Sequence, residues 1–237
     1  MATIISGLNC FEAWRKVAKY LIDHPKSNDT NVVVTIENPT DFCDLKNWIE
    51  KYNPQLVESE STNIRQVINT IFPYNLKSYF DDRHLFYLKY EQIYKNSRRK
   101  KWGTYFQRLI SFGKGFENSH INQLENAINA LRGDSPQKYF ITFHLTASNI
   151  ESNVRPLGGP CWQYGELTVN EDNSIDLIAI YRNHDYLNKA FGNFIGLAKL
   201  LEFICAESQR RPGKIVIHSI HAYSSKAISK LSQLLSK

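Results

Sequence analysis

One cysteine stands where a nucleophile would be useful. Cys161 follows a Gly-Gly-Pro turn in the stretch RPLGGPCWQYGEL and directly precedes a predicted strand. A cysteine thiolate is a strong nucleophile and a good metal ligand. Cys10, Cys43, Cys161 and Cys205 show no C-x-x-C spacing, which disfavours a zinc site and, with no export signal visible, a disulfide framework. Cys161 is therefore a candidate nucleophile; the alternative is a small buried residue after a turn.

Further polar residues interrupt the apolar segments that follow Cys161. Arg182 ends a predicted strand, Asp185 comes three residues later, and Asn193 lies just before a very apolar helix that its amide could cap. His221 and Tyr223 alternate at the end of the last predicted strand, so both side chains should share one face. Each residue also has an ordinary structural explanation: a loop salt bridge, a helix cap or a buried histidine. Functional side chains nevertheless commonly come together at the ends of strands and the starts of helices.

In order and spacing these residues resemble the thymidylate synthase family. The matching motifs are GGPCW, then YRNHDYLNKAFGN before the apolar helix, then HSIHAY. The upstream stretch INQLENAINALRGDSPQKYFITFHLTA is similar to the helix and strand that precede the family's cysteine. The resemblance covers residues 102–223 and is poor before them.

The resemblance implies a covalent reaction on a pyrimidine nucleotide. Cys161 would add to C6 of the base as a thiolate, with its pKa below the usual value of about 8.5. Arg182 would favour that thiolate and also hold the 5′-phosphate. Asn193 would read the amide edge of the base, and an asparagine there favours uracil because relatives that act on cytosine nucleotides usually carry aspartate.

The remaining residues would bind the sugar and the one-carbon donor. By the same resemblance, His221 and Tyr223 would hydrogen-bond the ribose hydroxyl. Asp185 would contact the pterin of 5,10-methylenetetrahydrofolate. No metal is expected. Lys138 stands in the pair Gln137-Lys138, where the family has two arginines that reach the phosphate of the partner subunit, so one cation of two is retained.

The chain also departs from the family. The segment HPKSNDTNVVV contains no arginine for the family's phosphate loop, and Ile68 and Asn69 stand where an acid is expected. Trp102 and Gly103 replace a tyrosine-glycine element, with Tyr105 nearby as a substitute base. The chain continues only briefly after the HSIHAY motif, without the family's closing tail. Water exclusion would suffer, which leaves three outcomes open: a hydroxymethyl product in place of a methyl product, activity only with a partner, or loss of catalysis.

Three functions follow from this pattern. The first is a transferase that adds a folate-derived one-carbon unit to C5 of a uracil nucleotide resembling dUMP, with hydroxymethylation as its variant. The second is a catalytically degenerate protein of the same fold that binds a nucleotide or a protein partner. The third is nucleic-acid binding through Arg98, Arg99, Lys100 and Lys101, for which the ordinary interpretation is a solvated loop.

The elements that must position these residues follow from hydrophobic periodicity. Helices are predicted at residues 11–22, over much of 41–94, and at 119–133 and 190–211. Strands are predicted at residues 31–39 and 138–147, in a hairpin over 162–182, and at 214–223, after a turn at Pro212-Gly213. Because residues 194–205 are apolar nearly all round, that helix should be central to the core.

These elements predict an α+β fold in which a thymidylate-synthase-like mixed β-sheet packs on one long hydrophobic helix. We expect a single domain over residues 1–237: a divergent part at 1–100, a family-like core at 101–223 and a short polar tail at 224–237. The resemblance implies a homodimer through the sheet face.

The overall composition is that of an ordinary globular protein. Of the 237 residues 42% are hydrophobic, and the formal net charge is +6. No apolar stretch is long enough to span a bilayer, and the start of the chain, MATIISGLNCF, shows no signal peptide. A cytoplasmic protein with free thiols is the expectation.

Overall fold

A computed structural model describes residues 1–43, 47, 64–95, 103–112, 121–146 and 159–224. Its strands are β1 (Thr3–Gly7), β2 (Asn28–Ile36), β3 (Ile141–His144), β4 (Trp162–Val169), β5 (Ser174–Tyr181), β6 (His184–Asp185) and β7 (Arg211–Tyr223). They form one sheet in the order β1-β2-β7-β5-β4-β3, with the short β6 paired to β7. The pairs β1/β2, β5/β7 and β6/β7 are parallel and the others antiparallel, which confirms the predicted mixed sheet.

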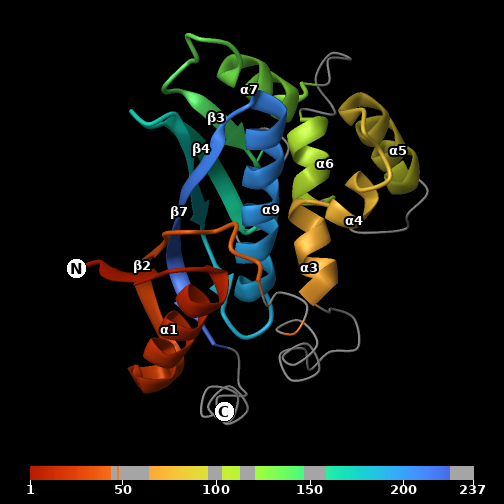
Figure 1. Ribbon diagram of the computed structural model, residues 1–237. Coiled ribbons are helices and arrows are strands. Elements are labelled where there is room, and N and C mark those ends of the chain that lie inside the picture. The colour runs from red at the N-terminus through yellow and green to blue at the C-terminus, as the bar shows by residue number, and fades with distance from the viewer. Residues whose placement is uncertain (44–46, 48–63, 96–102, 113–120, 147–158, 225–237) are drawn as a thin grey trace.

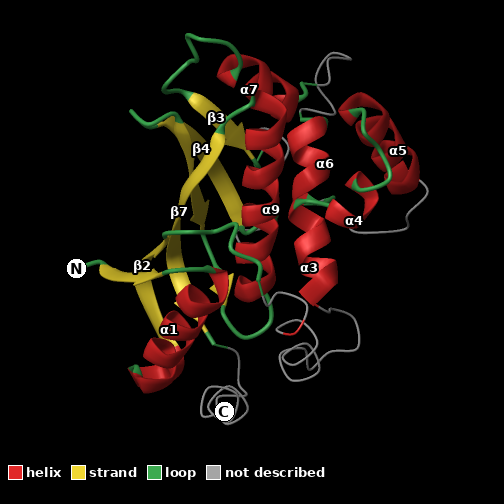
Figure 2. Cartoon of the chain, in the orientation of Figure 1, coloured by secondary structure: helices red, strands yellow, loops and turns green. Residues whose placement is uncertain are grey.

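The helices lie beside this sheet (Figures 1 and 2). They are α1 (Cys10–Asp23), α3 (Ile64–Ile71), α4 (Tyr74–Lys77), α5 (Arg83–Lys95), α6 (Tyr105–Ile110), α7 (Gln123–Leu131) and α9 (Ala190–Ser208), with a short 3-10 turn η1 (Pro25–Ser27) after α1. Together with the sheet they enclose one continuous hydrophobic cluster.

Helix α9 is the centre of this core, as its all-round apolar sequence predicts. It lies between the sheet and α3 (Figure 1). Two glycines permit close contact with α3: a Cβ added at Gly192 would lie 2.7 Å from the Val67 Cβ atom. At Gly196 it would lie 3.0 Å from the Ile71 Cβ atom. A larger residue at either position would push the two helices apart.

The two faces of the sheet differ in their surroundings. On β5, Leu177, Ala179 and Tyr181 are fully buried, whereas the alternating Ile178 and Ile180 keep partial exposure. Strand β7 repeats this alternation, with Val216 half-buried and Ile220 43% exposed on the face opposite the core. Among the described elements, the large helices lie on the other side of the sheet (Figure 2). The sheet therefore presents an open face that carries several apolar residues.

Some expected elements differ from the structure. The strand predicted at 138–147 is confined to β3 and begins only at Ile141, because Phe140 just before it adopts a left-handed φ of 66°. Strand β3 forms an edge of the sheet. Pro212 and Gly213 lie inside β7 rather than in a turn; the chain reverses at Gln209, whose φ of 60° ends α9. Strand β1 and helix α6 had no sequence prediction. The basic run at 98–101 and most of the predicted tail, 225–237, lie outside the described residues.

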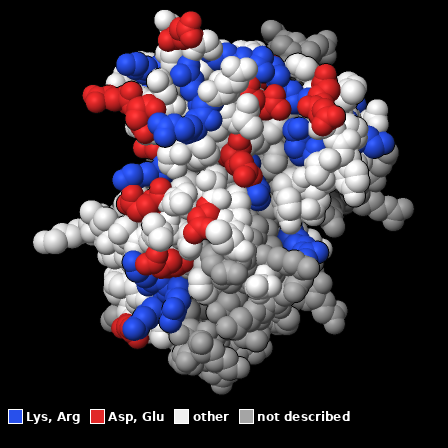
Figure 3. All heavy atoms as spheres, in the orientation of Figure 1, with Lys and Arg blue, Asp and Glu red and all other residues white. Residues whose placement is uncertain are grey.

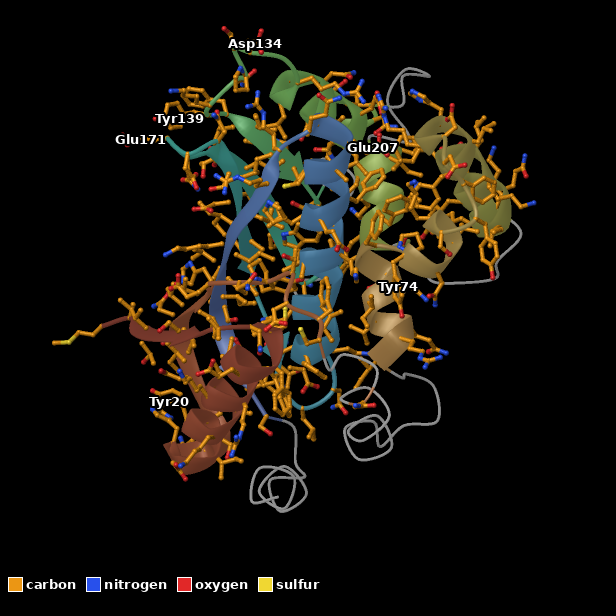
Figure 4. All side chains as sticks on the ribbon, viewed as in Figure 1. Tyr20, Tyr74, Asp134, Tyr139, Glu171 and Glu207 are labelled. Atoms are coloured by element: carbon orange, nitrogen blue, oxygen red, sulfur yellow. The ribbon has the colours of Figure 1, made fainter. Side chains whose placement is uncertain are left out.

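An ion-pair cluster joins α5, α7 and the C-terminal end of α9. Arg83 contacts Glu125 through two hydrogen bonds of 2.6 and 2.8 Å and Glu207 through one of 3.2 Å. Figure 4 labels Glu207 near the end of α9. The side chains of Arg83, Glu125 and Glu207 are only 14%, 16% and 19% exposed, so the cluster is largely withdrawn from water.

Replacement of Arg83 by methionine is expected to lower the free energy of unfolding by about 2 kcal/mol, because Glu125 would lose its arginine partner and Glu207 would keep only the contact with Arg132 at 3.9 Å, while both carboxylates stay largely buried. Arg83 holds the pKa of Glu125 below its ordinary value of 4.5. This stabilisation is therefore complete above that value and is lost as the pH falls through the lowered pKa. Denaturant unfolding at neutral and acid pH should show the wild-type and variant curves converging in acid.

Arg211→Met is the matched control. Arg211 pairs with Asp172 at 3.2 Å, but the two side chains are 70% and 62% exposed. Exposed pairs contribute about 0–1 kcal/mol, so this variant should unfold nearly as the wild type does. Equal destabilisation by the two substitutions would contradict a stabilising role for the buried cluster.

Candidate active site

The β4/β5 hairpin brings Cys161 beside Arg182. Trp162 pairs with Tyr181 at the open end of the hairpin, so the residues just outside that pair are neighbours across it. The Arg182 N–H donates to the Cys161 carbonyl at 2.9 Å, and Arg182 Nη2 donates to the Gly159 carbonyl at 3.1 Å. Gly159 has a left-handed φ of 88°, which a side chain would disfavour. The glycine-proline turn therefore fixes the cysteine against the arginine.

Tyr105, at the start of α6, holds the backbone of the cysteine. Its hydroxyl oxygen accepts hydrogen bonds from the N–H groups of Cys161 and Trp162, both at 3.2 Å. Burial raises the pKa of Tyr105 to about 12, so the phenol is neutral near pH 7. The hydroxyl of Tyr105 thus binds the backbone of the residue that carries the thiol. Its role as a base stays a prediction.

The charge environment of the thiol differs from the expectation. Burial raises the pKa of Cys161 above its ordinary value of 9.0. The Arg182 guanidinium opposes this through its charge and a hydrogen bond, Lys189 opposes it through its charge, and the Asp185 carboxylate raises the pKa further. The expectation that Arg182 would bring the pKa of Cys161 below its usual value is therefore wrong for this structure, because desolvation outweighs the cations.

The rate of Cys161 alkylation by iodoacetamide should accordingly rise with pH and reach its midpoint above the ordinary thiol value. A Cys43→Ser background removes the exposed cysteine, while Cys10 and Cys205 are buried. Arg182→Gln should move the midpoint to higher pH because it removes the strongest opposing charge.

Two lysine variants complete that experiment. Lys189→Gln should raise the midpoint less than the arginine substitution does, since Lys189 acts through charge alone. Lys199→Gln is the control: Lys199 pairs with Glu202 at 2.9 Å and does not contribute to the pKa of Cys161. A wild-type midpoint below the ordinary value, or one insensitive to Arg182→Gln, would contradict this electrostatic account.

Asp185 organises the turn that leads into α9. Its Oδ1 atom accepts hydrogen bonds from the backbone N–H of Leu187 at 3.0 Å and of Asn188 at 3.1 Å, and Oδ2 accepts one from Asn188 Nδ2 at 2.9 Å. This is the side-chain turn geometry typical of aspartate. A loop salt bridge between Arg182 and Asp185, the ordinary alternative to a functional role, is not among the ion pairs of the described residues. Because a carboxylate oxygen accepts more than one hydrogen bond, Oδ2 retains acceptor capacity.

His221 and Tyr223 share a face, as their alternation predicts. Their rings stack with centroids 5.3 Å apart at 11°, and His221 Nδ1 donates to Asn183 Oδ1 at 2.7 Å. Burial raises the pKa of Tyr223, the charges of Asp185 and Cys161 add to the rise, and a hydrogen bond with Asn183 lowers it. The register of β6 on β7 also pairs Asp185 with Tyr223. The end of the last strand thus lies beside Asp185, and the charge of Cys161 acts on Tyr223.

Asn193 does not cap α9. The N-cap position is Lys189, which makes no side-chain capping bond, and Asn193 lies within the first turn of the helix. The cap prediction is therefore wrong. Asn193 is 5% exposed, and its Nδ2 atom lies 3.1 Å from Nε2 of the buried His184. Its amide is thus fixed by a side chain, not by the helix end.

Lys138 lies away from these residues within one chain. It is exposed, and its carbonyl accepts a hydrogen bond from Val169 N at the far end of β4. Cys161 precedes the other end of that strand, so the two positions are roughly 25 Å apart at the usual rise per residue. The structure therefore places Lys138 outside the cluster around Cys161.

Asn69, where the family's acid is expected, is in α3. Its Oδ1 atom is buried and has no hydrogen-bond partner among the residues that the structure describes. The neighbouring Ile68 is fully buried, and its carbonyl faces Gly196 of α9.

Three residues near the cluster had no sequence prediction: Asn183, His184 and Lys189. All three lie in the motif YRNHDYLNKAFGN, between residues that were selected. Their signal is a polar type beside a strand end or before a helix, which is too common to choose them without the fold.

The described residues hold no group of three or more His, Cys, Asp or Glu side chains that could bind a metal ion. None of the helices within the described ranges is long and apolar enough to cross a membrane.

On the face drawn in Figure 3, Lys and Arg are interspersed with Asp and Glu.

Distant curated relatives of this chain share one name. A protein of Methanosarcina mazei named "Putative thymidylate synthase" is 28% identical over 120 residues, which is 51% of each chain. The chain thus matches about half the length of this relative. A protein of the same name from Methanothermobacter marburgensis is 27% identical over 240 residues, 94% of this chain and 93% of the relative. No protein-family model matches the chain. These distant relatives suggest a thymidylate-synthase-like family.

Proposed function

We propose that the protein is a thymidylate-synthase-like transferase that adds a folate-derived one-carbon unit to C5 of a uracil nucleotide through a covalent bond between Cys161 and C6. The observation that carries this proposal is the contact of Cys161 with Arg182 at the open end of the β4/β5 hairpin. A thiol beside a guanidinium supplies the nucleophile and an anion-binding group together. The names of the relatives support the same class.

In the proposed reaction the Cys161 thiolate donates an electron pair to C6, and the C5–C6 π electrons move toward O4. C5 of the resulting enolate would take the one-carbon unit from bound 5,10-methylenetetrahydrofolate, and the bond between that carbon and the folate nitrogen would break with its electrons staying on nitrogen. The folate would also supply the hydride that a methyl product requires, whereas attack by water on the same carbon would give a hydroxymethyl product. The C5 proton leaves, and the sulfur–C6 bond breaks with its electrons returning to sulfur. Arg182 holds the nucleotide phosphate and favours the thiolate, while His221 and Tyr223 bind the ribose hydroxyl.

Asp185 fits the proposed contact with the pterin. Its Oδ2 atom accepts a single hydrogen bond, from Asn188 Nδ2 at 2.9 Å, among the contacts of the described residues. A pterin N–H group is a suitable second donor. The bonds from Leu187 and Asn188 to the other oxygen hold the carboxylate in place, so it is oriented before a ligand binds.

A homodimer through the open sheet face is part of the proposal. The exposed and half-buried Ile178, Ile180, Val216 and Ile220 give that face an apolar surface suited to a second sheet. Lys138 would then serve the nucleotide phosphate of the other copy, as the resemblance implies, since it lies away from Cys161 in its own chain. Sedimentation at micromolar concentration should show a dimer; a 27.5 kDa monomer would overturn this part.

The test is incubation with 5-fluoro-dUMP and methylenetetrahydrofolate followed by mass spectrometry. Fluorine at C5 cannot leave as a proton does, so the sulfur–C6 bond should persist as an adduct on the peptide that contains Cys161. With dUMP in place of the fluorinated nucleotide, the mass of the product distinguishes a methyl from a hydroxymethyl group.

A second candidate is a catalytically degenerate protein that binds a nucleotide or a protein partner on the same scaffold. One observation favours it: burial raises the pKa of Cys161, whereas a dedicated nucleophile normally has a lowered one. Unmodified protein that still binds dUMP in calorimetry would support this candidate and overturn the transferase.

A further inference from the structure

A chain of buried polar groups runs from the start of α9 into the sheet. His184 is 1% exposed; its Nε2 atom lies 3.1 Å from Asn193 Nδ2 and its Nδ1 atom 2.9 Å from Ser219 Oγ. The same Ser219 oxygen lies 3.2 Å from the Tyr186 hydroxyl. These four residues come from β6, β7, α9 and the turn before α9. Their hydrogen bonds therefore connect Asn193 on α9, the proposed reader of the base, to the three other elements.

The histidine ring itself is held in one orientation. Tyr181 stacks on it with centroids 4.2 Å apart at 5°, and Phe194 packs against its edge at 5.9 Å. Close packing on both sides disfavours a flip of the ring, so the same nitrogen faces Asn193. Which ring nitrogen carries the proton then depends on the donor and acceptor atoms that face the ring, because the ring itself does not turn.

That arrangement follows from the groups that face each other. An amide nitrogen only donates hydrogen bonds, so the Nε2 atom that it faces must accept. The single proton of the neutral ring is therefore on Nδ1 and is donated to Ser219 Oγ. Burial lowers the pKa of His184 to about 3, so the ring is neutral at physiological pH and carries a single proton there.

We infer that His184 is a positioning residue that fixes the direction of the Asn193 amide and thereby makes the site selective for uracil over cytosine nucleotides. With one N–H bonded to His184, the amide offers a ligand its Oδ1 atom and its second N–H. No described residue hydrogen-bonds that Oδ1 atom. The inference rests on the proposed function in taking the ligand to be a pyrimidine nucleotide.

The selectivity follows from the two bases. Uracil presents N3–H as a donor and O4 as an acceptor, which match Oδ1 and the second N–H of the fixed amide. Cytosine presents N3 as an acceptor and its exocyclic amine as a donor, which require the amide to be turned over. Turning it would place Oδ1 against Nε2, so the histidine proton would have to move from Nδ1 to Nε2.

The tautomer can be measured without any nucleotide. Long-range ¹H–¹⁵N correlation spectra of histidine-labelled protein should show the His184 ring protonated at Nδ1, with Nε2 as a hydrogen-bonded acceptor. The His184→Gln variant assigns the signals. Protonation at Nε2 would overturn the inference, whatever the protein binds.

Calorimetry with dUMP and dCMP then measures the consequence. Glutamine at position 184 can face Asn193 with either end of its own amide, so His184→Gln should reduce the preference for dUMP by roughly fivefold, the worth of one neutral hydrogen bond. Ser219→Ala removes the acceptor of the Nδ1 proton and should act in the same direction. Ser219→Thr keeps the hydroxyl and should restore the preference.

Ser208→Ala is the matched control, since it removes another buried serine hydroxyl, bonded to the Ile204 carbonyl at 2.7 Å near the other end of α9. It should leave the ratio of the two affinities unchanged. If His184→Gln and Ser219→Ala weaken both nucleotides equally, their role is structural and the inference fails. If the wild type binds neither nucleotide, the proposed function fails, and the selectivity inference fails with it even where the tautomer is as expected.

Discussion

Cys161→Ser protein is expected to form no detectable adduct with 5-fluoro-dUMP while binding dUMP with near wild-type affinity. Serine keeps the size and polarity of the side chain, but its hydroxyl ionises far less readily than a thiol and is a much weaker nucleophile. The rate of adduct formation should fall on the order of a thousandfold or more, as for removal of other nucleophiles. Mass spectrometry measures the adduct, and calorimetry measures the reversible binding.

Cys205→Ser is the control for this substitution. Cys205 is 1% exposed within α9 and is separate from the residues around Cys161, so its loss should leave adduct formation intact. Persistence of the adduct in the Cys161→Ser protein would assign the nucleophile to another residue. Loss of dUMP binding together with the adduct would mean that the thiol acts in binding or folding rather than in chemistry.

Local sequence patterns predicted much of the framework that carries this thiol. The all-round apolar run of α9 requires a buried central helix. The compact turn at residues 170–173 between two alternating segments requires the β4/β5 hairpin, and that hairpin alone places Cys161 beside Arg182. The alternation of His221 and Tyr223 likewise sets their common face. These features depend on residues that are close in sequence, so local patterns were sufficient to predict them.

Features that depend on long-range packing could not be predicted in the same way. The backbone at Lys189 forms the N-cap of α9, and Asp185 bonds the turn just before it, so Asn193 is left inside the helix. The pKa of Cys161 depends on how completely α6, β4 and β5 exclude water, which no spacing reveals. The buried contact of His184 with Ser219 joins residues far apart in sequence.

Lys138 illustrates the same limit at the scale of the whole chain. The match of Gln137-Lys138 to a pair of phosphate-binding arginines compares residue types at aligned positions. It does not give the distance between Lys138 and Cys161 in the folded chain. Pairing of the Lys138 carbonyl with Val169 puts this cation at the opposite end of β4 from the cysteine. The phosphate role of Lys138 therefore depends on a second copy of the chain, whereas the role of Arg182 does not.

Arg182→Ala is accordingly expected to weaken dUMP binding roughly tenfold to a hundredfold, about 1.5–3 kcal/mol, the worth of a hydrogen bond to a charged group. We expect the upper half of that range, because Arg182 is the cation in direct contact with Cys161. Adduct formation should fall as well, since the substitution also raises the pKa of the thiol. Calorimetry of the wild type and the variant gives the ratio of the two affinities.

Two further variants separate charge from geometry at this position. Arg182→Lys keeps the positive charge but loses the planar fork that binds phosphate through two parallel hydrogen bonds, so its affinity should lie between those of the wild type and Arg182→Ala. Arg132→Ala, which removes a half-exposed cation that contacts Glu207 near the end of α9, should bind dUMP as the wild type does. Equal affinity in the wild type and Arg182→Ala would place the phosphate elsewhere, and the resemblance around Cys161 would then be one of sequence pattern without a shared ligand.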